Sequence, residues 1–352
     1  MIDGQYRNTY ALINLTNLKK NIQSIIKKSP GYKYYMGVVK ADCYGHGNCI
    51  KTIIEAGCNY LAVSSLEEAL IIRKEHKNIP ILCLGPVKPE FLYLCRKNAI
   101  SVTISSLDYL KLVKNIKNLR IHLKIDTGMN RLGFKNKEDF KEAFELLKNN
   151  IEGIFTHIYY GEDKERTNNQ FKKFKEIISS IDYSKIPMIH VFGTEGIWDY
   201  PKLPYTNGIR IGQGMFGMLP TNKFKIETTF TLHSEVIEVK EVKKGEDVGY
   251  GARYVADKDT YVAIIPIGYV DGIIRTNRGR DVYINNKPYP IIGSICMDML
   301  MVSVDESVKI FDKVDLIKDR FHLYEIVEYN NTCAEEIICI IGKRVPRIYK
   351  EN

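Results

Sequence analysis

The residues around one lysine favour a buried, reactive amine instead of a solvated surface charge. Lys40 follows the apolar run Met36-Gly37-Val38-Val39 and precedes a turn that contains Gly45 and Gly47. Most lysines lie in solvent, but a lysine that closes a buried strand is partly removed from water. Desolvation lowers the pKa of an amine and makes it nucleophilic toward carbonyl carbon. Lys40 is therefore the first candidate for a covalent catalytic group.

Further reactive or ligand-binding side chains follow other apolar runs. Asp126 and His157 close two of these runs, Thr194 follows a third, and Arg210 and Gly212 end a fourth. Glycine lets backbone N–H groups approach a phosphate, and a hydroxyl adds a hydrogen bond. A reactive lysine beside a phosphate site suggests either a Schiff-base aldolase or a pyridoxal-phosphate enzyme.

These residues need a scaffold that brings strand ends together. The first 215 residues alternate apolar runs with segments of helical periodicity such as 105–115, 137–150 and 165–181. Eight runs are predicted to be strands, at 34–40, 60–64, 81–85, 100–104, 119–126, 151–157, 188–193 and 208–212. Eight βα units of this size are typical of a (β/α)8 barrel, whose active site lies at the C-terminal ends of the strands. A doubly wound open sheet is the alternative fold.

The pattern changes after about residue 225. Strands are predicted at 230–239, 261–267, 281–284, 290–296, 299–304 and 313–317. Asn285-Asn286-Lys287 fits a hairpin turn, and only 335–342 looks helical. We therefore predict an α/β barrel domain over residues 1–225 and a C-terminal, mostly β domain over residues 226–352.

Composition excludes several classes of protein. The net charge is +9, but the basic residues are scattered, whereas a nucleic-acid surface gathers them in one stripe. No apolar run approaches the roughly 18 residues of a membrane span, and the N-terminus lacks the apolar stretch of a signal peptide. The eight cysteines form no Cys-x-x-Cys pair or zinc-finger pattern. We expect a cytoplasmic protein with reduced thiols, no bound metal, and neither nucleic acid nor membrane as a partner.

Several motifs resemble those of the alanine racemase family. The run Val38-Val39-Lys40-Ala41-Asp42-Cys43-Tyr44-Gly45-His46-Gly47 is similar to the cofactor-attachment motif of that family. Further matches follow in the family's order and spacing, at 124–133, 156–157, 249–251, 268–272, 296–298 and 344–347. The resemblance covers essentially the whole chain. It implies pyridoxal 5'-phosphate as cofactor, an amino acid as substrate, racemisation of alanine, and a head-to-tail homodimer with shared active sites.

The same resemblance implies individual roles. Lys40 binds the cofactor as a Schiff base and is the base on one face of the substrate, and Tyr250 of the partner subunit is the base on the other face. Arg210 faces the pyridine nitrogen, and His157 packs against the ring. The phosphate is expected to be held by Tyr44, Thr194, Gly212 and Gln213. Lys124 matches a position that is carbamylated in some members. The substrate is expected to be bound by Arg131, Met297, Asp298 and Tyr269.

The sequence also departs from the family pattern. Lys343 replaces the usual tyrosine before Arg344, a tyrosine that contacts the phosphate and narrows the substrate pocket. Lysine can still meet a phosphate as a point charge, or it can accommodate a polar substrate side chain. Thr194 replaces a serine, and the segment 193–198 adds charge and bulk. These changes leave open a racemase for serine or for a broader set of amino acids.

Two further functions are less favoured. A pyridoxal-phosphate decarboxylase of the same architecture would use Cys296 across the subunit interface, but such enzymes lack the pattern of residues 38–47. A non-enzymatic carrier of the cofactor is a barrel alone and would not need the β domain or Tyr250.

Overall fold

The computed structural model describes residues 6–113, 118–147, 149–194, 196–219 and 225–351. Eight parallel strands close into a barrel, because β2 pairs with β3 on one side and with β9 on the other. The predicted barrel is therefore confirmed, and the open sheet is wrong. The strands are β2 (Tyr34–Val38), β3 (Tyr60–Val63), β4 (Ile81–Cys83), β5 (Ile100–Ile104), β6 (Ile121–Lys124), β7 (Ile151–Phe155), β8 (Met188–His190) and β9 (Gly208–Ile211).

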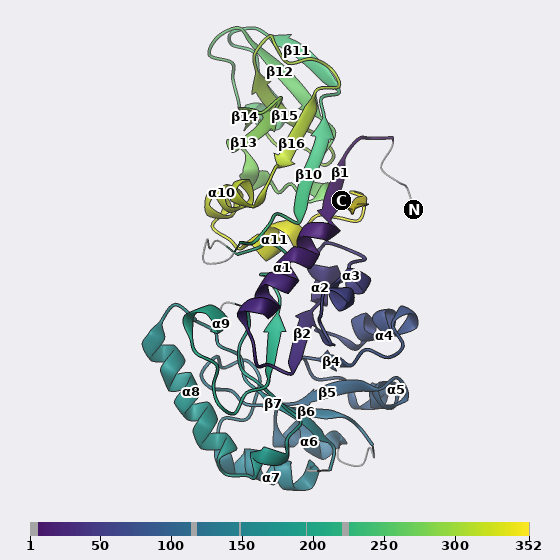
Figure 1. The fold of residues 1–352 in the computed structure, drawn as a ribbon. Helices are drawn as coiled ribbons and strands as arrows, with labels where there is room; N and C mark the ends of the chain where they lie inside the picture. The colour runs from purple at the N-terminus through teal and green to yellow at the C-terminus, as the bar shows by residue number, and fades with distance from the viewer. Residues whose placement is uncertain (1–5, 114–117, 148, 195, 220–224, 352) are drawn as a thin grey trace.

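Helices surround the barrel strands (Figure 1). Their buried faces explain the periodicity of the sequence: α7, for example, buries Phe140, Ala143 and Leu147. Side chains also define where helices begin, because Ser65 and Glu68 form a reciprocal capping box at the start of α4. The helices of this region are α1 (Leu15–Lys28), α2 (Lys40–Tyr44), α3 (Ile50–Glu55), α4 (Leu66–Glu75), α5 (Leu92–Lys97), α6 (Leu107–Val113), α7 (Lys137–Leu147), α8 (Lys164–Ile178) and α9 (Gly196–Asp199).

The C-terminal region is a nine-stranded sheet in the order β11-β12-β15-β14-β13-β16-β10-β1-β17. The hairpin turn predicted at 285–287 is confirmed, with Lys287 already paired in β14. Asn285 and Asn286 both have positive φ, as a two-residue turn between β13 and β14 requires. The strands are β1 (Tyr10–Asn14), β10 (Phe230–Glu235), β11 (Glu238–Val242), β12 (Thr260–Ile265), β13 (Asp281–Ile284), β14 (Lys287–Ile292), β15 (Leu300–Val304), β16 (Lys313–Ile317) and β17 (Arg347–Lys350).

Several features of the C-terminal region differ from the prediction, among them strand β17, which was not expected. The expected strand 230–239 is two strands, because the chain leaves its partner β16 after Glu235 and pairs with β12 from Glu238. Strand β1 comes from the N-terminus but lies between β10 and β17, so residues 10–14 belong to this sheet and not to the barrel. Helix α10 (Arg320–Asn330) precedes α11 (Ala334–Cys339), although only the second was expected.

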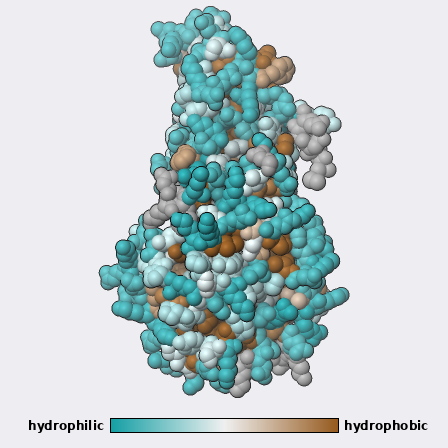
Figure 2. All heavy atoms as spheres, viewed as in Figure 1, coloured by the Kyte–Doolittle hydropathy of each residue, from teal (hydrophilic) through white to brown (hydrophobic). Residues whose placement is uncertain are grey.

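The two regions are stacked end to end, with the β domain above the barrel and α1 crossing between them (Figure 1). Figure 2 shows hydrophobic side chains on this face around the level where the two regions meet and over the barrel, among mainly hydrophilic surface. Five short 3-10 helices complete the described elements, at Pro89–Phe91, Tyr183–Lys185, Tyr250–Ala252, Tyr269–Asp271 and Arg275–Asn277. Within the described ranges, no helix has both the length and the apolar character needed to cross a membrane.

Candidate active site

The C-terminal ends of the barrel strands surround a cavity of about 480 Å³. Strand ends and the loops after them supply most of its lining, as the sequence predicted for a barrel site. The polar residues among them are Lys40, Tyr44, Ser64, Lys124, Arg131, His157, Tyr159, Thr194, Arg210, Gln213 and Glu335, with Gly212 beside them. Of the described charged side chains that line the cavity, four are cations and one is a carboxylate. The cavity is therefore suited to an anionic ligand.

Lys40 is held by an unusual backbone. The four residues after it, 41–44, have φ between 52° and 54°, which makes one turn of left-handed helix. Such a turn costs on the order of 1 kcal/mol per residue and persists only where neighbouring groups hold it. Glu68 of α4 is one of these groups, because its carboxylate accepts hydrogen bonds from the backbone N–H groups of Ala41 (2.6 Å) and Ser64 (2.8 Å). The position of Lys40 is therefore fixed by tertiary contacts.

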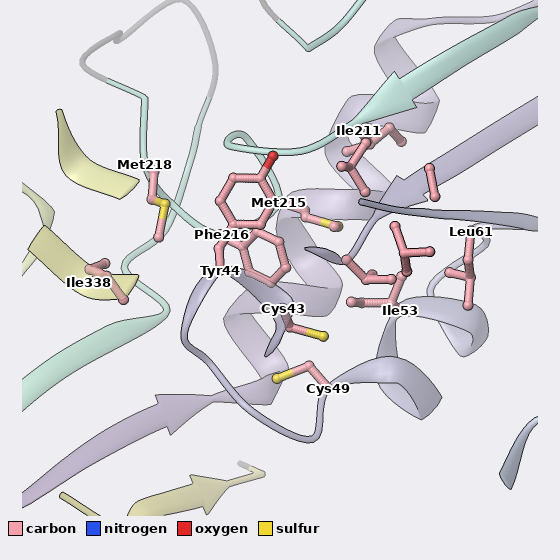
Figure 3. Close-up of a cluster of buried hydrophobic side chains, with 14 of the residues drawn as sticks. Cys43, Tyr44, Cys49, Ile53, Leu61, Ile211, Met215, Phe216, Met218 and Ile338 are labelled. Atoms are coloured by element: carbon pink, nitrogen blue, oxygen red, sulfur yellow. The ribbon is translucent and has the colours of Figure 1, made fainter. Parts of the chain in front are cut away.

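Tyr44 ends this turn with its ring packed among hydrophobic side chains. Its centroid lies 5.1 Å from that of Phe216, and Figure 3 shows the two rings beside each other. The Lys40 Nζ lies 5.8 Å from the Tyr44 ring centroid, and burial raises the pKa of the phenol, which stays protonated. A Cβ at Gly212 would lie 3.1 Å from the Tyr44 hydroxyl, while the Gly212 N–H donates to Thr194 Oγ1 at 3.1 Å. Tyr44, Thr194 and Gly212 thus form one small polar corner of the cavity.

Arg210 lies at the floor of the cavity with its guanidinium almost entirely bonded to the protein. Its Nη2 donates to the carbonyls of Thr156 (2.8 Å) and Val191 (2.9 Å), and its Nη1 donates to His190 Nδ1 (2.8 Å). Burial lowers the pKa of Arg210 to about 10, so the group remains cationic at neutral pH. These bonds fix the plane of the guanidinium.

His157 lies next to Arg210, with 3.4 Å between its Nδ1 and the Arg210 Nη2. Burial, followed by the charges of Arg210, Arg131, Lys124 and Lys40, lowers its pKa to about 3. His157 is therefore a neutral imidazole, suited to packing against an aromatic ring. Its backbone is held by the Gln170 amide, which donates to the His157 carbonyl at 3.0 Å.

Lys124 and Arg131 form a cationic side of the cavity. Burial, together with Arg131 and Arg210, lowers the pKa of Lys124 to about 8. Asp126, expected among the strand-end residues, does not line the cavity: its carboxylate accepts from the N–H groups of Gly128 and Asn130 and so shapes the loop that carries Arg131. A lysine with a pKa near 8 is partly neutral under physiological conditions, as carbamylation requires.

Glu335 is a cavity residue that the sequence did not indicate. It lies on α11 of the C-terminal region and accepts a hydrogen bond from the Gln213 side chain. The close approach of α11 explains Gly45, because a Cβ there would lie 2.8 Å from the Ile338 carbonyl. The signal for Glu335 is absent from local sequence, since only the packing of α11 against the Lys40 loop brings it to the cavity.

A second group of predicted residues lies outside this cavity, in the C-terminal region. Tyr250, Tyr269 and Met297 are exposed by 74%, 42% and 55%, and Asp298 is also exposed. The Tyr269 N–H donates to the Cys296 carbonyl at 3.0 Å, and Ser294 Oγ donates to the Tyr250 carbonyl at 2.8 Å, so both loops contact the segment 294–298 and form one cluster. Lys343 is likewise exposed and does not line the cavity. Glu195, in the segment 193–198 that differs from the family pattern, lies outside the described residues.

Comparison with known proteins decides the family. The family profiles described as the N-terminal and C-terminal domains of alanine racemase match residues 13–220 and 229–349. The chain belongs to the alanine racemase family. It is 37% identical to alanine racemase 1 of Bacillus subtilis over 99% of this chain and 94% of that protein.

Solved structures agree with this assignment. The alanine racemase of E. faecalis superposes with a TM-score of 0.93 at 31% identity, over 99% of this chain and 100% of that one. A histidine racemase from Leuconostoc mesenteroides has a TM-score of 0.87 at 24% identity, over 98% and 99% of the two chains. At that identity the likeness concerns the fold alone. The fold therefore leaves the choice of amino acid to the residues of the site.

Proposed function

We propose that this protein is a pyridoxal-phosphate-dependent racemase that interconverts L- and D-alanine. The observation that carries the proposal is the cavity in which Lys40, Arg210, His157 and the polar corner at Gly212 meet. Full-length relatives named alanine racemase support the reaction and the substrate. Two family profiles, one ending at residue 220 and one starting at residue 229, support the proposed boundary near residue 225 between domains 1–225 and 226–352, but residues 10–14 of the first range belong to the C-terminal sheet.

The described residues fit this cofactor on three counts. The Nε–H of Arg210 is the guanidinium donor that has no hydrogen-bond partner among the described residues, and Arg210 lines the cavity. The Tyr44 hydroxyl likewise has no partner within the described ranges, and it lies beside the backbone of Gly212, where a side chain would crowd it. The cations of the cavity compensate a phosphate. The Glu335 carboxylate would repel a phosphate in the same cavity, but it already accepts a hydrogen bond from the Gln213 side chain.

In this proposal Lys40 attaches the cofactor, Arg210 donates to the pyridine nitrogen, and His157 packs against the ring. Tyr44, Thr194, Gly212 and Gln213 hold the phosphate, and Lys343, which is exposed and outside the cavity lining, is expected to reach it only as a flexible point charge. When bound, pyridoxal phosphate withdraws electrons from the substrate and so acidifies its α-proton. Lys40 removes or returns that proton on one face. Arg131 holds the substrate carboxylate. Lys124 would steady Arg131 only in the carbamylated form, because a carbamate is anionic whereas the free amine, when protonated, repels the guanidinium.

Racemisation also needs a proton donor and acceptor on the opposite face of the substrate. Tyr250 fits this role chemically, but it is 74% exposed and does not line the cavity of its own chain. We infer that two chains form a homodimer in which Tyr250, Tyr269, Met297 and Asp298 of the partner subunit complete each site. The exposed apolar side chains around them, including Met299 and Val270, support burial against another chain.

The site is compatible with a cytoplasmic setting, because all eight cysteines are free thiols.

A second candidate activity is the racemisation of serine or of a broader set of amino acids. Relatives usually carry a tyrosine where this chain has the exposed Lys343. A flexible side chain thus replaces a bulky ring that narrows the substrate pocket, and this change favours the second candidate.

The test is a screen of L-amino acids for D-product with the purified, cofactor-loaded protein. Conversion of L-alanine well above all others supports the proposal. Serine turnover above alanine would replace it with the second candidate, and release of carbon dioxide without D-product would replace it with decarboxylation.

A further inference from the structure

The buried charge of Arg210 is not balanced by an opposite charge on its immediate neighbours. It is 5% exposed and cationic, yet among the described residues no carboxylate forms an ion pair with it. A buried charge without a charged partner is costly. Its neutral partners are carbonyl oxygens and the rings of His190 and His157.

A chain of hydrogen bonds leads from Arg210 through the interior of the barrel. Arg210 Nη1 lies 2.8 Å from His190 Nδ1, His190 Nε2 lies 3.1 Å from His122 Nδ1, and His122 Nε2 lies 3.3 Å from the Tyr60 hydroxyl. The Tyr60 hydroxyl donates to Glu152 Oε2 at 3.3 Å. His122 and His190 are fully buried, and Tyr60 is 4% exposed. Glu152 is the second residue of β7, at the end of the barrel opposite the cavity.

The direction of each bond from Arg210 as far as the Tyr60 hydroxyl is determined. Arginine only donates, so His190 Nδ1 accepts and its hydrogen lies on Nε2. His190 then donates to His122 Nδ1, which places the His122 hydrogen on Nε2, toward Tyr60. Burial lowers the pKa of His122 to about 3 and that of His190 well below its usual value, so both rings are neutral. Burial and Glu152 raise the pKa of Tyr60, which therefore remains a donor.

Neighbouring residues enclose the histidine part of this chain and leave room for it, whereas the Glu152 side chain is 31% exposed. The Phe155 ring stacks on His190 with 4.7 Å between the centroids. Gly153 is required beside His122, because a Cβ at that position would overlap the His122 ring. At the far end Ser101 Oγ lies 3.0 Å from the Tyr60 hydroxyl and donates to Glu152, so Tyr60 is connected to the carboxylate both directly and through Ser101. Arg120 Nε lies 3.7 Å from Glu152 Oε1.

We propose that Glu152 is the remote charge partner of Arg210 and acts as a positioning residue through Tyr60, His122 and His190. All donors in the chain point from the guanidinium to the carboxylate, so each bond polarises the next. The carboxylate thereby stabilises the buried cation across the barrel and fixes the orientation in which Arg210 meets the cavity. The catalytic consequence rests on the proposed function, but the hydrogen-bond chain can be measured without it.

The experiment is proton and ¹⁵N NMR of the full-length, cofactor-loaded protein with labelled histidine. The chain has seven histidines, so the ring signals can be assigned with single substitutions. In the Glu152→Gln variant, the Nε2–H proton signal of His122 should move upfield, and that of His190 should move in the same direction by less. Tyr60→Phe, which keeps the carboxylate but removes the hydroxyl, should give the same pattern. The racemase kcat of both variants should fall about threefold, with KM less affected.

Asp315→Asn is the matched control, because Asp315 accepts from His233 Nδ1 at 2.7 Å in the other domain. It should move the His233 signals and leave His122 and His190 unchanged. Unchanged His122 and His190 signals in both Glu152→Gln and Tyr60→Phe would overturn the proposal, whatever the activity. If the signals move as expected but the parent protein racemises no amino acid, the hydrogen-bond chain stands and the proposed function fails.

Discussion

The barrel cavity and the Tyr250 cluster carry the two proposed bases in opposite structural settings. Lys40 is held by a left-handed turn, by Glu68 and by the packing of α11, all within one chain. Tyr250 lies in a 3-10 helix with most of its side chain in solvent. In the proposed function, a folded chain therefore completes the cofactor side of the site but leaves the second face open. We infer that cofactor attachment depends on folding, whereas racemisation depends also on assembly.

The largest expected effect comes from Lys40→Ala. It removes both the attachment point and one base, so racemisation should fall to background and the visible absorbance of the covalently bound cofactor should vanish. Lys20→Ala, an exposed lysine of α1, is the matched control and should change neither. Persistence of the absorbance band in Lys40→Ala would show that another lysine carries the cofactor.

Tyr250→Phe separates the two regions. The variant should keep the absorbance band, because the cavity is intact, and should slow exchange of the α-proton mainly for one enantiomer, since each base serves one face. Exchange rates in deuterated solvent, measured from L- and D-alanine separately, test this. Tyr254→Phe is the control for general effects on these loops. An equal loss for both enantiomers would contradict the two-face arrangement.

A smaller effect concerns stability in acid, which the buried histidines of the barrel should lower. His122 and His157 have pKa values lowered to about 3 in the folded protein, so between that value and about 6.5 the unfolded chain binds protons that the folded chain does not. The free energy of unfolding should therefore fall as pH drops below about 6.5, by roughly 2 kcal/mol per buried histidine at pH 5. Urea unfolding at pH 7 and pH 5 measures this. His122→Gln should show a weaker pH dependence, and an equal dependence would show that these rings are not responsible.

The barrel was predictable because parallel strands buried on both faces appear as short apolar runs. The meeting of Lys40, His157, Thr194 and Arg210 followed, since strand ends share one mouth. Long-range pairing was not predictable. Strand β1 is only five residues and pairs with segments more than 200 residues away, and Glu335 reaches the cavity through the packing of α11. Helix α10 does have a local start signal, because Asp319 caps its first turn.

The central claim is that each site takes Lys40 from one chain and Tyr250 from the partner subunit, and mixed dimers test it most directly. Lys40→Ala and Tyr250→Phe chains are each expected to be defective alone. If the chains reassort at random, half of the dimers contain one chain of each kind, and each such dimer has one intact site. The account predicts recovery of about one quarter of the activity of the unmodified protein. Activity that stays at the level of the separate variants would contradict the shared site.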